Sequence, residues 1–311
     1  MFAPDPTARD CTPAGDTSTE LPVAPTIAAC VTAWYDRNAR DLPWRRPGFS
    51  AWGTLVSEFM LQQTPVNRVV PRLDEWLARW PTPADLAAVP PGEAVRAWSS
   101  LGYPRRALWL HACAVAITER HDGIVPHSVD ALLALPGIGD YTARAVAAFA
   151  YGKRHPVVDT NIRRVLARAV AGQGEPAPPS TKRDLAAMDA ILPDGEFEAR
   201  AFNAGMMELG ALVCTARSPH CDVCPLRNIC AWRSAGYPRY EGQRKPLQKR
   251  YEGSDRYVRG LIMRELRGSH VPVTDAEIEQ LWEDAAQGKR ALASLVSDGL
   301  AVRGEGGYLL P

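Results

Sequence analysis

Four closely spaced cysteines constrain the fold of this chain more than any other feature of its sequence. They follow the pattern C-x6-C-x2-C-x5-C and are Cys214, Cys221, Cys224 and Cys230. Four soft thiolates in so short a loop form a ligand set for zinc or for an iron–sulfur cluster. The residues between them are mostly polar, so a group of four core cysteines explains the pattern poorly. Because no position is left open for a substrate, we expect a structural rather than a catalytic metal site.

The remaining cysteine usage favours a reducing compartment. The chain has seven cysteines, an odd number, and begins without a basic-then-apolar export signal. Both observations argue against a framework of disulfides. The sequence also lacks an apolar run of eighteen residues, so it predicts no transmembrane helix. We therefore expect a cytoplasmic protein.

A glycine-rich turn forms the second constraining feature. Pro136-Gly137-Ile138-Gly139 separates an apolar helix end at 131–135 from an alanine-rich helix at 141–151. The unpaired N–H groups in the first turn of the second helix would face the tip of this hairpin, where a phosphate group fits well. An ordinary helix–helix turn is the alternative interpretation.

A carboxylate follows the hairpin after a short apolar stretch. Val157 and Val158 predict buried chain that ends at Asp159. The carboxylate is a candidate catalytic group, and the alternative is a helix N-cap for the segment 162–170.

Helical periodicity covers most of residues 26–213, and no convincing strand pattern interrupts it. Besides the two hairpin helices, we expect helices at 26–40, 52–63, 66–80, 91–101, 105–121, 181–192 and 200–212. A loop at 40–47 is aromatic and cationic and contains Arg45. The sequence therefore predicts a mostly α-helical domain.

Glu58 is the second candidate catalytic carboxyl. It lies in the middle of the predicted helix 52–63 among apolar residues such as Val56 and Phe59. Apolar surroundings disfavour the ionised form and raise a carboxyl pKa towards the range of a general acid. The alternative is a solvated glutamate on the outer face of the helix.

Composition shifts divide the 311 residues into four parts. We expect a disordered lead at 1–25, a helical domain at 26–235, a basic linker at 236–254 and a small module at 255–311. The module reads as helices and short strands that end in a β-hairpin, a pattern typical of winged-helix domains, which bind DNA or proteins. The formal net charge of +1 predicts no global field for nucleic acid, so phosphate contacts must be local.

Taken in order, these features resemble one superfamily, the helix-hairpin-helix base-excision DNA glycosylases with a cysteine cluster. The matching motifs are LPGIG at 135–139, the aspartate after VV, the helix that contains Glu58 and the four cysteines. Within it, SEFMLQQT at 57–64, LGY at 101–103 and VVDTN at 157–161 resemble the MutY-type adenine DNA glycosylases. The resemblance covers residues 26–235 and implies a two-lobed helix-hairpin-helix fold with a 4Fe–4S cluster loop at 214–230.

The resemblance also implies a reaction and its catalytic residues. The substrate would be double-stranded DNA in which adenine is mispaired with 8-oxoguanine or guanine, and the adenine must leave the base stack to be reached. Glu58 would protonate the purine, and Asp159 would stabilise the oxocarbenium-like sugar. Tyr141 and Asn161 would position these groups. Bifunctional relatives carry a lysine where this chain has Tyr141, so we expect base removal without strand cleavage.

Five further residues would contact DNA according to the same resemblance. Gln63 and Tyr103 would wedge into the duplex, and the N–H groups around Gly137 and Gly139 would hold the phosphate backbone. Arg45 joins them as a cation in the aromatic loop. We expect a monomer that acts on nucleoid DNA.

Two departures from the family pattern leave alternatives open. Residues 255–311 are too short for the MutT-like domain with which many relatives inspect 8-oxoguanine, and Pro104 replaces a second tyrosine. A glycosylase of the same superfamily that removes thymine from T·G pairs is therefore one alternative. The other is a non-catalytic DNA-binding protein with a structural metal.

Overall fold

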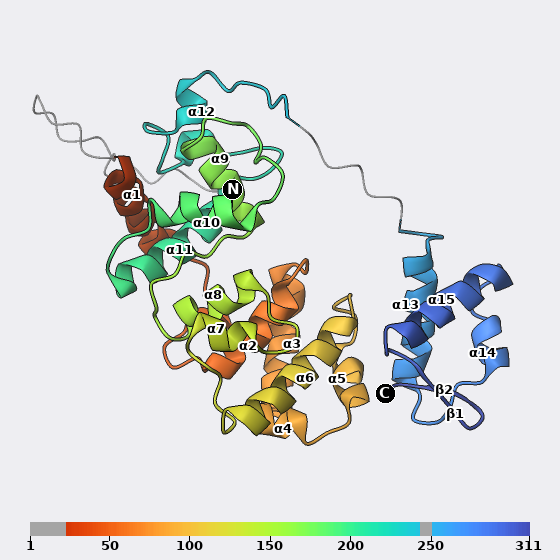
Figure 1. The fold of residues 1–311 in the computed structure, drawn as a ribbon. Coiled ribbons are helices and arrows are strands. Elements are labelled where there is room, and N and C mark those ends of the chain that lie inside the picture. The colour runs from red at the N-terminus through yellow and green to blue at the C-terminus, as the bar shows by residue number, and fades with distance from the viewer. Residues whose placement is uncertain (1–22, 243–250) are drawn as a thin grey trace, which may run out of the picture. The chain divides into compact units, whose positions relative to one another are not determined.

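A computed structural model describes residues 23–242 and 251–311 of the chain. Most of the expected lead at 1–25 and part of the expected basic linker at 236–254 lie outside the described residues. Helices make up nearly all of the regular structure, with one two-stranded sheet near the C-terminus (Figure 1). The predicted mostly helical fold class is confirmed. No helix within the described ranges is long and apolar enough to cross a bilayer.

The described residues divide into two compact units, and neither is a single stretch of chain. The first unit combines residues 23–42 with 140–242, and the second combines 43–139 with 251–311. The helices of the first unit are α1 (Val23–Asn38), α8 (Asp140–Phe149), α9 (Thr160–Ala169), α10 (Thr181–Asp189), α11 (Glu196–Leu212), η2 (Cys221–Val223) and α12 (Ala231–Ser234).

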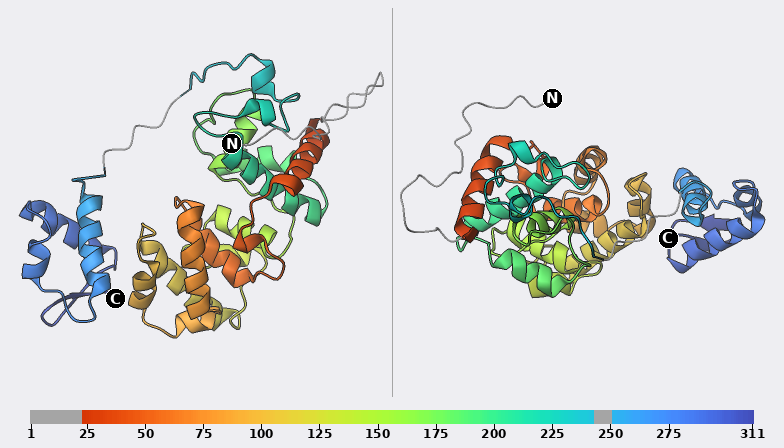
Figure 2. Two further views of the ribbon diagram at one scale, coloured as in Figure 1. Left: turned by 180° about the vertical axis from the view of Figure 1, so that it is seen from behind. Right: turned by 90° about the horizontal axis from the view of Figure 1, so that it is seen from above.

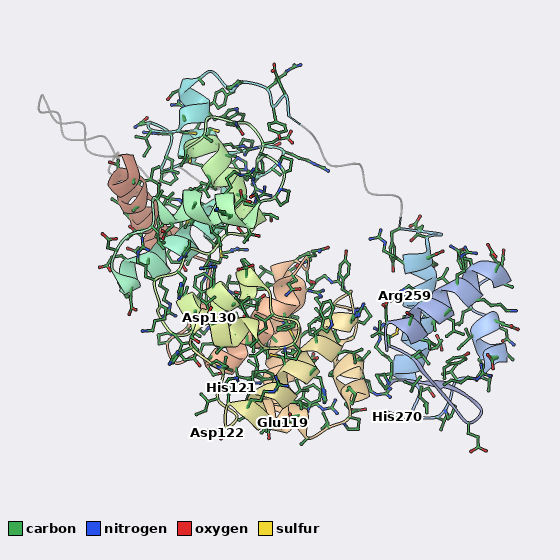
Figure 3. The ribbon with its side chains drawn as sticks, viewed as in Figure 1. Glu119, His121, Asp122, Asp130, Arg259 and His270 are labelled. Carbon is green, nitrogen blue, oxygen red and sulfur yellow. The ribbon has the colours of Figure 1, made fainter. Side chains whose placement is uncertain are left out.

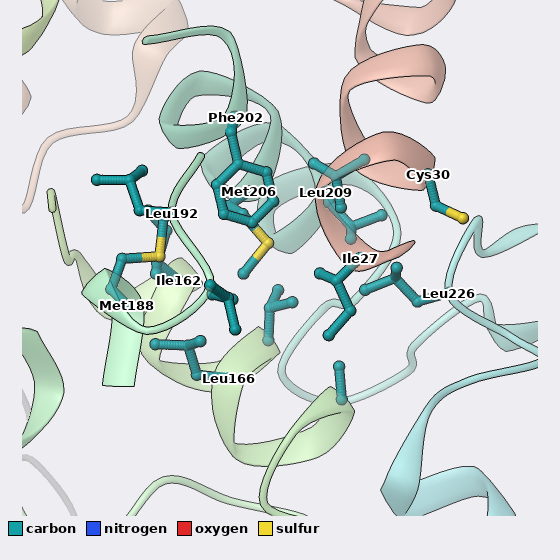
Figure 4. Close-up of a cluster of buried hydrophobic side chains, with 14 of the residues drawn as sticks. Ile27, Cys30, Ile162, Leu166, Met188, Leu192, Phe202, Met206, Leu209 and Leu226 are labelled. Carbon is teal, nitrogen blue, oxygen red and sulfur yellow. The ribbon is translucent and has the colours of Figure 1, made fainter. Parts of the chain in front are cut away.

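The core of the first unit forms between α1, α9 and α11. Helix α1 lies along α11, and α11 in turn packs against α9 (Figure 2). Their apolar faces meet in one cluster, which also takes residues from α10 (Figure 4). Fully buried members include Ile27, Ile162, Phe202, Met206 and Leu209. Burial of five such side chains stabilises the unit by about 1.5–3 kcal/mol each.

Close helix contacts in this unit depend on two glycines of α11. A Cβ on Gly205 would lie 2.8 Å from a methyl group of Val31, and one on Gly210 would lie 2.7 Å from the Cβ of Asn161. Glu208, between them, is buried and accepts two hydrogen bonds from the guanidinium of Arg40, at 2.8 and 2.7 Å. This bidentate pair attaches the chain after α1 to α11.

The second unit builds its core around tryptophans and helix α2. Its helices up to the hairpin are η1 (Pro43–Arg45), α2 (Ala51–Leu61), α3 (Val66–Arg79), α4 (Pro83–Ala87), α5 (Pro91–Trp98), α6 (Arg105–Arg120) and α7 (Val129–Leu133). Trp76 packs edge-on against Trp80 and Trp98, with ring centroids 4.7 and 5.7 Å apart. Helix α4 was not expected from the sequence, because its five residues are too few to show a period.

Residues 255–311 consist of three helices followed by a β-hairpin, the order predicted for a winged-helix-like module. The elements are α13 (Asp255–Gly268), α14 (Asp275–Glu279), α15 (Ala285–Ser297), β1 (Val302–Gly304) and β2 (Gly307–Leu309). Arg259 of α13, labelled in Figure 3, donates a 2.6 Å hydrogen bond to Asp298 after α15. The expected strand at 271–273 is a single bridge between Val273 and Tyr308.

Candidate active site and cluster loop

Asp159 caps helix α9 and is half-buried. One carboxylate oxygen accepts a 2.7 Å hydrogen bond from the backbone N–H of Ile162, and the other accepts a 2.9 Å bond from the side-chain amide of Asn161. The cap interpretation from the sequence is therefore confirmed. Burial raises the pKa of Asp159, while these hydrogen bonds and the charge of Arg164 act in the opposite direction.

The segment that leads into Asp159 is held by a buried asparagine. Asn203 of α11 accepts a 3.0 Å hydrogen bond from the N–H of Val157 and donates a 3.0 Å bond to the carbonyl of His155. Tyr141, in the first turn of α8, packs against a small cluster that includes Val157. The backbone before Asp159 is thus supported from two helices, although residues 157–158 form no regular strand.

Arg164 connects this carboxylate to the cysteine loop, a role that was not predicted from the sequence. Its guanidinium donates to the side-chain oxygen of Asn161 at 2.7 Å and to the carbonyl of Cys214 at 2.6 Å. A third bond reaches the carbonyl of Gly210 at 2.6 Å. A continuous path of hydrogen bonds therefore runs from the backbone of Cys214 through Arg164 and Asn161 to Asp159. Only the spacing of Asn161 and Arg164, three residues apart on a helix, could have suggested part of it.

The four cysteines line one pocket in the first unit. Arg168, Arg227 and Arg233 are also among the residues that line this pocket. Among the described residues, no three His, Cys, Asp or Glu side chains meet closely enough to hold a single metal ion. Four sulfur donors with neighbouring cations fit an anionic iron–sulfur group.

Arg168 secures the start of the cysteine loop from α9. It is 4% exposed and lies 4.9 Å from the centroid of the Trp232 ring. Its guanidinium donates to the carbonyls of Gly174 and Thr215, at 2.9 and 2.7 Å, and approaches the sulfur of Cys214 at 3.5 Å. Such N–H donors near sulfur stabilise the negative charge of a metal-bound thiolate.

Glu58 lies inside the second unit and is 6% exposed. Helix α2 begins at its N-cap Ser50, whose hydroxyl accepts a 2.9 Å bond from the N–H of Gly53. Every residue from Trp52 to Met60 is buried. The alternative of a solvated glutamate on an outer helix face is therefore wrong.

The glycine turn packs against the helix that carries Glu58. Gly137 has a φ of +75°, and a Cβ there would lie 2.6 Å from the Cβ of Trp109 and 3.2 Å from the ring of Phe59. Only glycine satisfies both the backbone angle and the space. No atom lies within 4 Å of the Cβ position of Gly139, and α8 begins at the next residue. The turn is thus supported on one side and open at Gly139.

Gln63 and Tyr103 occupy two loops of the second unit in the same unusual backbone conformation. Their φ angles are +55° and +48°, in the left-handed region that favours glycine. Both side chains are exposed, Tyr103 to 48%. Arg45, at the end of η1, is half-buried.

Comparison with known proteins assigns the two motifs to described families. Residues 56–188 match the HhH-GPD superfamily of base excision DNA repair proteins, and residues 214–230 match the iron–sulfur binding domain of endonuclease III. The second match begins at Cys214 and ends at Cys230. The chain accordingly carries a 4Fe–4S cluster.

Two mycobacterial relatives are similar over most of the chain. The chain is 57% identical to the adenine DNA glycosylase of Mycolicibacterium smegmatis, over 86% of this chain and 90% of that protein. It is 52% identical to the adenine DNA glycosylase of Mycobacterium tuberculosis, over 90% of this chain and 91% of that protein.

A solved structure shares the fold at greater distance. The structure of a thermostable thymine-DNA glycosylase aligns with a TM-score of 0.63 at 27% identity, covering 68% of this chain and 97% of that one.

Proposed function

The chain belongs to the adenine DNA glycosylases of the HhH-GPD superfamily, and on that premise we propose that it removes adenine mispaired with 8-oxoguanine or guanine from double-stranded DNA. It hydrolyses the N-glycosidic bond as the first step of base-excision repair. The observation that carries the proposal is Asp159, a half-buried carboxyl held by Asn161 and by the first turn of α9 in a chain 57% identical to an adenine DNA glycosylase. We further propose that it acts as a monomer on nucleoid DNA in the cytoplasm.

Glu58 acts as the general acid in this proposal. Adenine is a poor leaving group as an anion, and protonation of the purine ring lets it depart as a neutral base. The burial of Glu58 within α2 supports this role.

Asp159 acts as the negative charge that stabilises the sugar cation. As the bond to adenine breaks, positive charge develops on the deoxyribose, and a carboxylate on that side lowers the barrier. Asn161 and the N–H of Ile162 fix the carboxylate in place. Tyr141, beside the segment that precedes Asp159, positions the sugar and cannot form a Schiff base. We therefore propose a monofunctional enzyme that leaves an intact abasic strand.

The DNA contacts come from three places on the chain. The N–H groups around Gly137 and Gly139, with the first turn of α8, bind a backbone phosphate. Gln63 and Tyr103 enter the duplex from their exposed loops and hold the gap that the extruded adenine leaves. Arg45 adds a cation near the aromatic loop.

The ligands of the iron–sulfur cluster are the four cysteines that line the pocket in the first unit. When bound, the cluster supplies a compact anionic centre around which the loop 214–230 is organised. Through Arg164, the same loop supports the position of Asn161. We also propose that the small module at 255–311 binds DNA or a protein.

A second candidate function is the removal of thymine from T·G pairs. The structural similarity to a thymine-DNA glycosylase favours it, but the similarity to the adenine enzymes is higher and extends further along the chain. The two candidate functions differ in the base that the active site accepts.

A panel of duplexes tests the proposal. Purified protein is incubated with duplexes that carry adenine opposite 8-oxoguanine, guanine or cytosine, and with a T·G duplex, and abasic sites are revealed with alkali. We expect cuts in the adenine strand opposite 8-oxoguanine and guanine, and only after alkali. Cuts in the T·G duplex alone would support the second candidate. Binding without any product would favour the non-catalytic DNA-binding alternative.

A further inference from the structure

Arg106 is a buried cation at an unusual place in the second unit. It lies in the first turn of α6, is 4% exposed, and has only backbone carbonyls and one hydroxyl as its hydrogen-bond acceptors in the described structure. Burial lowers the pKa of Arg106 to about 10, so the side chain remains a cation at neutral pH. Burying a guanidinium without a carboxylate partner costs folding free energy. We therefore expect Arg106 to have a role beyond packing.

Both ends of the guanidinium reach the loop that follows α2, and one of them also reaches the loop that precedes α6. One terminal nitrogen, Nη1, donates to carbonyls at the end of α2, those of Phe59 at 2.9 Å and of Gln62. The other, Nη2, donates to the hydroxyl of Thr64 at 3.2 Å and to the carbonyl of Gly102 at 3.0 Å. The planar fork of arginine suits such a bridge, because its donors point in fixed directions. A cation also fits the negative end of the α2 dipole.

Secondary contacts reinforce this bridge between the loops. The hydroxyl of Thr64 donates to the carbonyl of Leu101 at 3.2 Å, across from one loop to the other. The indole N–H of Trp98 donates to the same Gly102 carbonyl at 2.9 Å. The guanidinium carbon of Arg106 lies 5.3 Å from the ring centroid of Tyr103.

The bridged loops are those of Gln63 and Tyr103. Both residues adopt positive φ angles that cost energy for any residue with a Cβ, and such conformations persist only where the surroundings impose them. The carbonyl before Gln63 and the carbonyl before Tyr103 are both acceptors of Arg106. One side chain therefore fixes the backbone immediately before each exposed residue.

We propose that Arg106 is a positioning residue that holds the Gln63 and Tyr103 loops together as one rigid wedge for opening the DNA duplex. The inference rests on the proposed function, since it assigns Arg106 to the extrusion of the base and not to bond cleavage. A rigid wedge lowers the cost of inserting two side chains into the base stack, because neither loop must be ordered during insertion.

The test compares Arg106→Lys with Arg120→Lys, an exposed arginine in the last turn of the same helix. Lysine keeps the charge but offers a single ammonium group that cannot serve both loops. Excision is measured under single-turnover conditions on adenine opposite 8-oxoguanine and on adenine opposite an abasic-site analogue, where little unpairing is needed. We expect Arg106→Lys to slow the first reaction about 10- to 100-fold and the second less than about threefold, as follows from a loss confined to extrusion. Equal losses on both substrates would overturn the proposal.

A second comparison removes the wedge side chains. In a Gln63→Ala, Tyr103→Ala background, Arg106→Lys should lose most of its effect, because residues that act through one another are not additive. An unchanged effect in that background would also overturn the proposal. The unfolding midpoint and iron content of each variant serve as checks on the fold, and Arg106→Gln replaces the lysine variant if that one does not fold.

A fluorescence readout separates this inference from the proposed function. A 2-aminopurine base beside the mispair reports unstacking without any excision. If the wild-type protein removes adenine from none of the duplexes, the proposed function fails. Even then, a smaller fluorescence rise with Arg106→Lys than with Arg120→Lys would support the role of Arg106 in the wedge. Equal rises for the two variants would refute it.

Discussion

Replacing Asp159 with asparagine separates the catalytic role of this residue from its role as a helix cap. The wild-type carboxylate accepts hydrogen bonds from Ile162 and Asn161. Asparagine is as good an N-cap as aspartate, so the bond from Ile162 is kept. The bond from Asn161 is lost or must rearrange, which costs about 1 kcal/mol.

The raised pKa of Asp159 means that the same substitution also removes a contribution that lowers the stability of the folded state. A carboxyl whose pKa is higher in the folded state than in the unfolded state gives its full contribution to stability below the unfolded value and loses it as the pH rises through the folded value. At neutral pH the ionised Asp159 therefore lowers stability, and a neutral amide removes that cost. We expect Asp159→Asn to change the free energy of unfolding by no more than about 1 kcal/mol. Asp159→Ala, which also loses the cap, should cost about 2 kcal/mol.

The rate of excision should respond quite differently. Asparagine cannot supply the negative charge that faces the sugar cation, so we expect the single-turnover rate to fall by about 10²- to 10³-fold or more in both variants. Excision is measured on adenine opposite 8-oxoguanine with alkali treatment, and stability by urea unfolding. Activity within tenfold of wild type for Asp159→Asn would refute the reasoning, as would a loss of activity that simply followed the loss of stability.

Four further outcomes follow from the structure. Glu58→Gln keeps the shape of the buried side chain but removes its proton, and should slow excision by about 10²- to 10⁴-fold in the same assay with little change in DNA affinity; an unchanged rate would contradict the general-acid role. Because burial raises the pKa of Asp159, the single-turnover rate should fall on acidification at a pH above the usual aspartate value of 3.8, and a rate that is constant down to that pH would be inconsistent with this. Gly137→Ala places a methyl group against a tryptophan at a positive φ and should lower the free energy of unfolding by about 1–3 kcal/mol. Gly139→Ala should leave stability nearly unchanged and weaken DNA binding. Equal effects of the two variants would argue against a packing role for Gly137 and a DNA-binding role for Gly139. Cys224→Ser should reduce the iron content and the iron–sulfur absorbance and lower the unfolding midpoint, and a full complement of iron in this variant would exclude Cys224 as a ligand.

Local sequence patterns predicted the elements that depend only on residues close together in the chain. The glycine turn at 136–139, the helix around Glu58 and the cysteine spacing each combine residues within about twenty positions, where periodicity and turn chemistry apply. The helix expected at 200–212 begins earlier, at Glu196, because the acidic residues of its first turn have no apolar period.

Buried arginines were not predictable in the same way. Arg106, Arg164 and Arg168 read in the sequence as ordinary helix residues, but each donates to backbone carbonyls of a segment that lies far along the chain. The bidentate pair of Arg40 and Glu208 joins residues 168 positions apart. Such partners are set by tertiary packing, and a single sequence contains no pattern that pairs a cation with a distant carbonyl.

The discontinuous first unit has a consequence for how the chain is made. Helix α1 buries Ile27 and Val31 against a partner helix, α11, that follows about 180 residues later, and ribosomes add roughly 5–20 residues per second. During synthesis, the apolar face of α1 therefore remains without its partner helix for about 10–40 s, while the helices of the second unit emerge first. A nascent chain that stalls before α11 would expose that apolar face to chaperones and proteases.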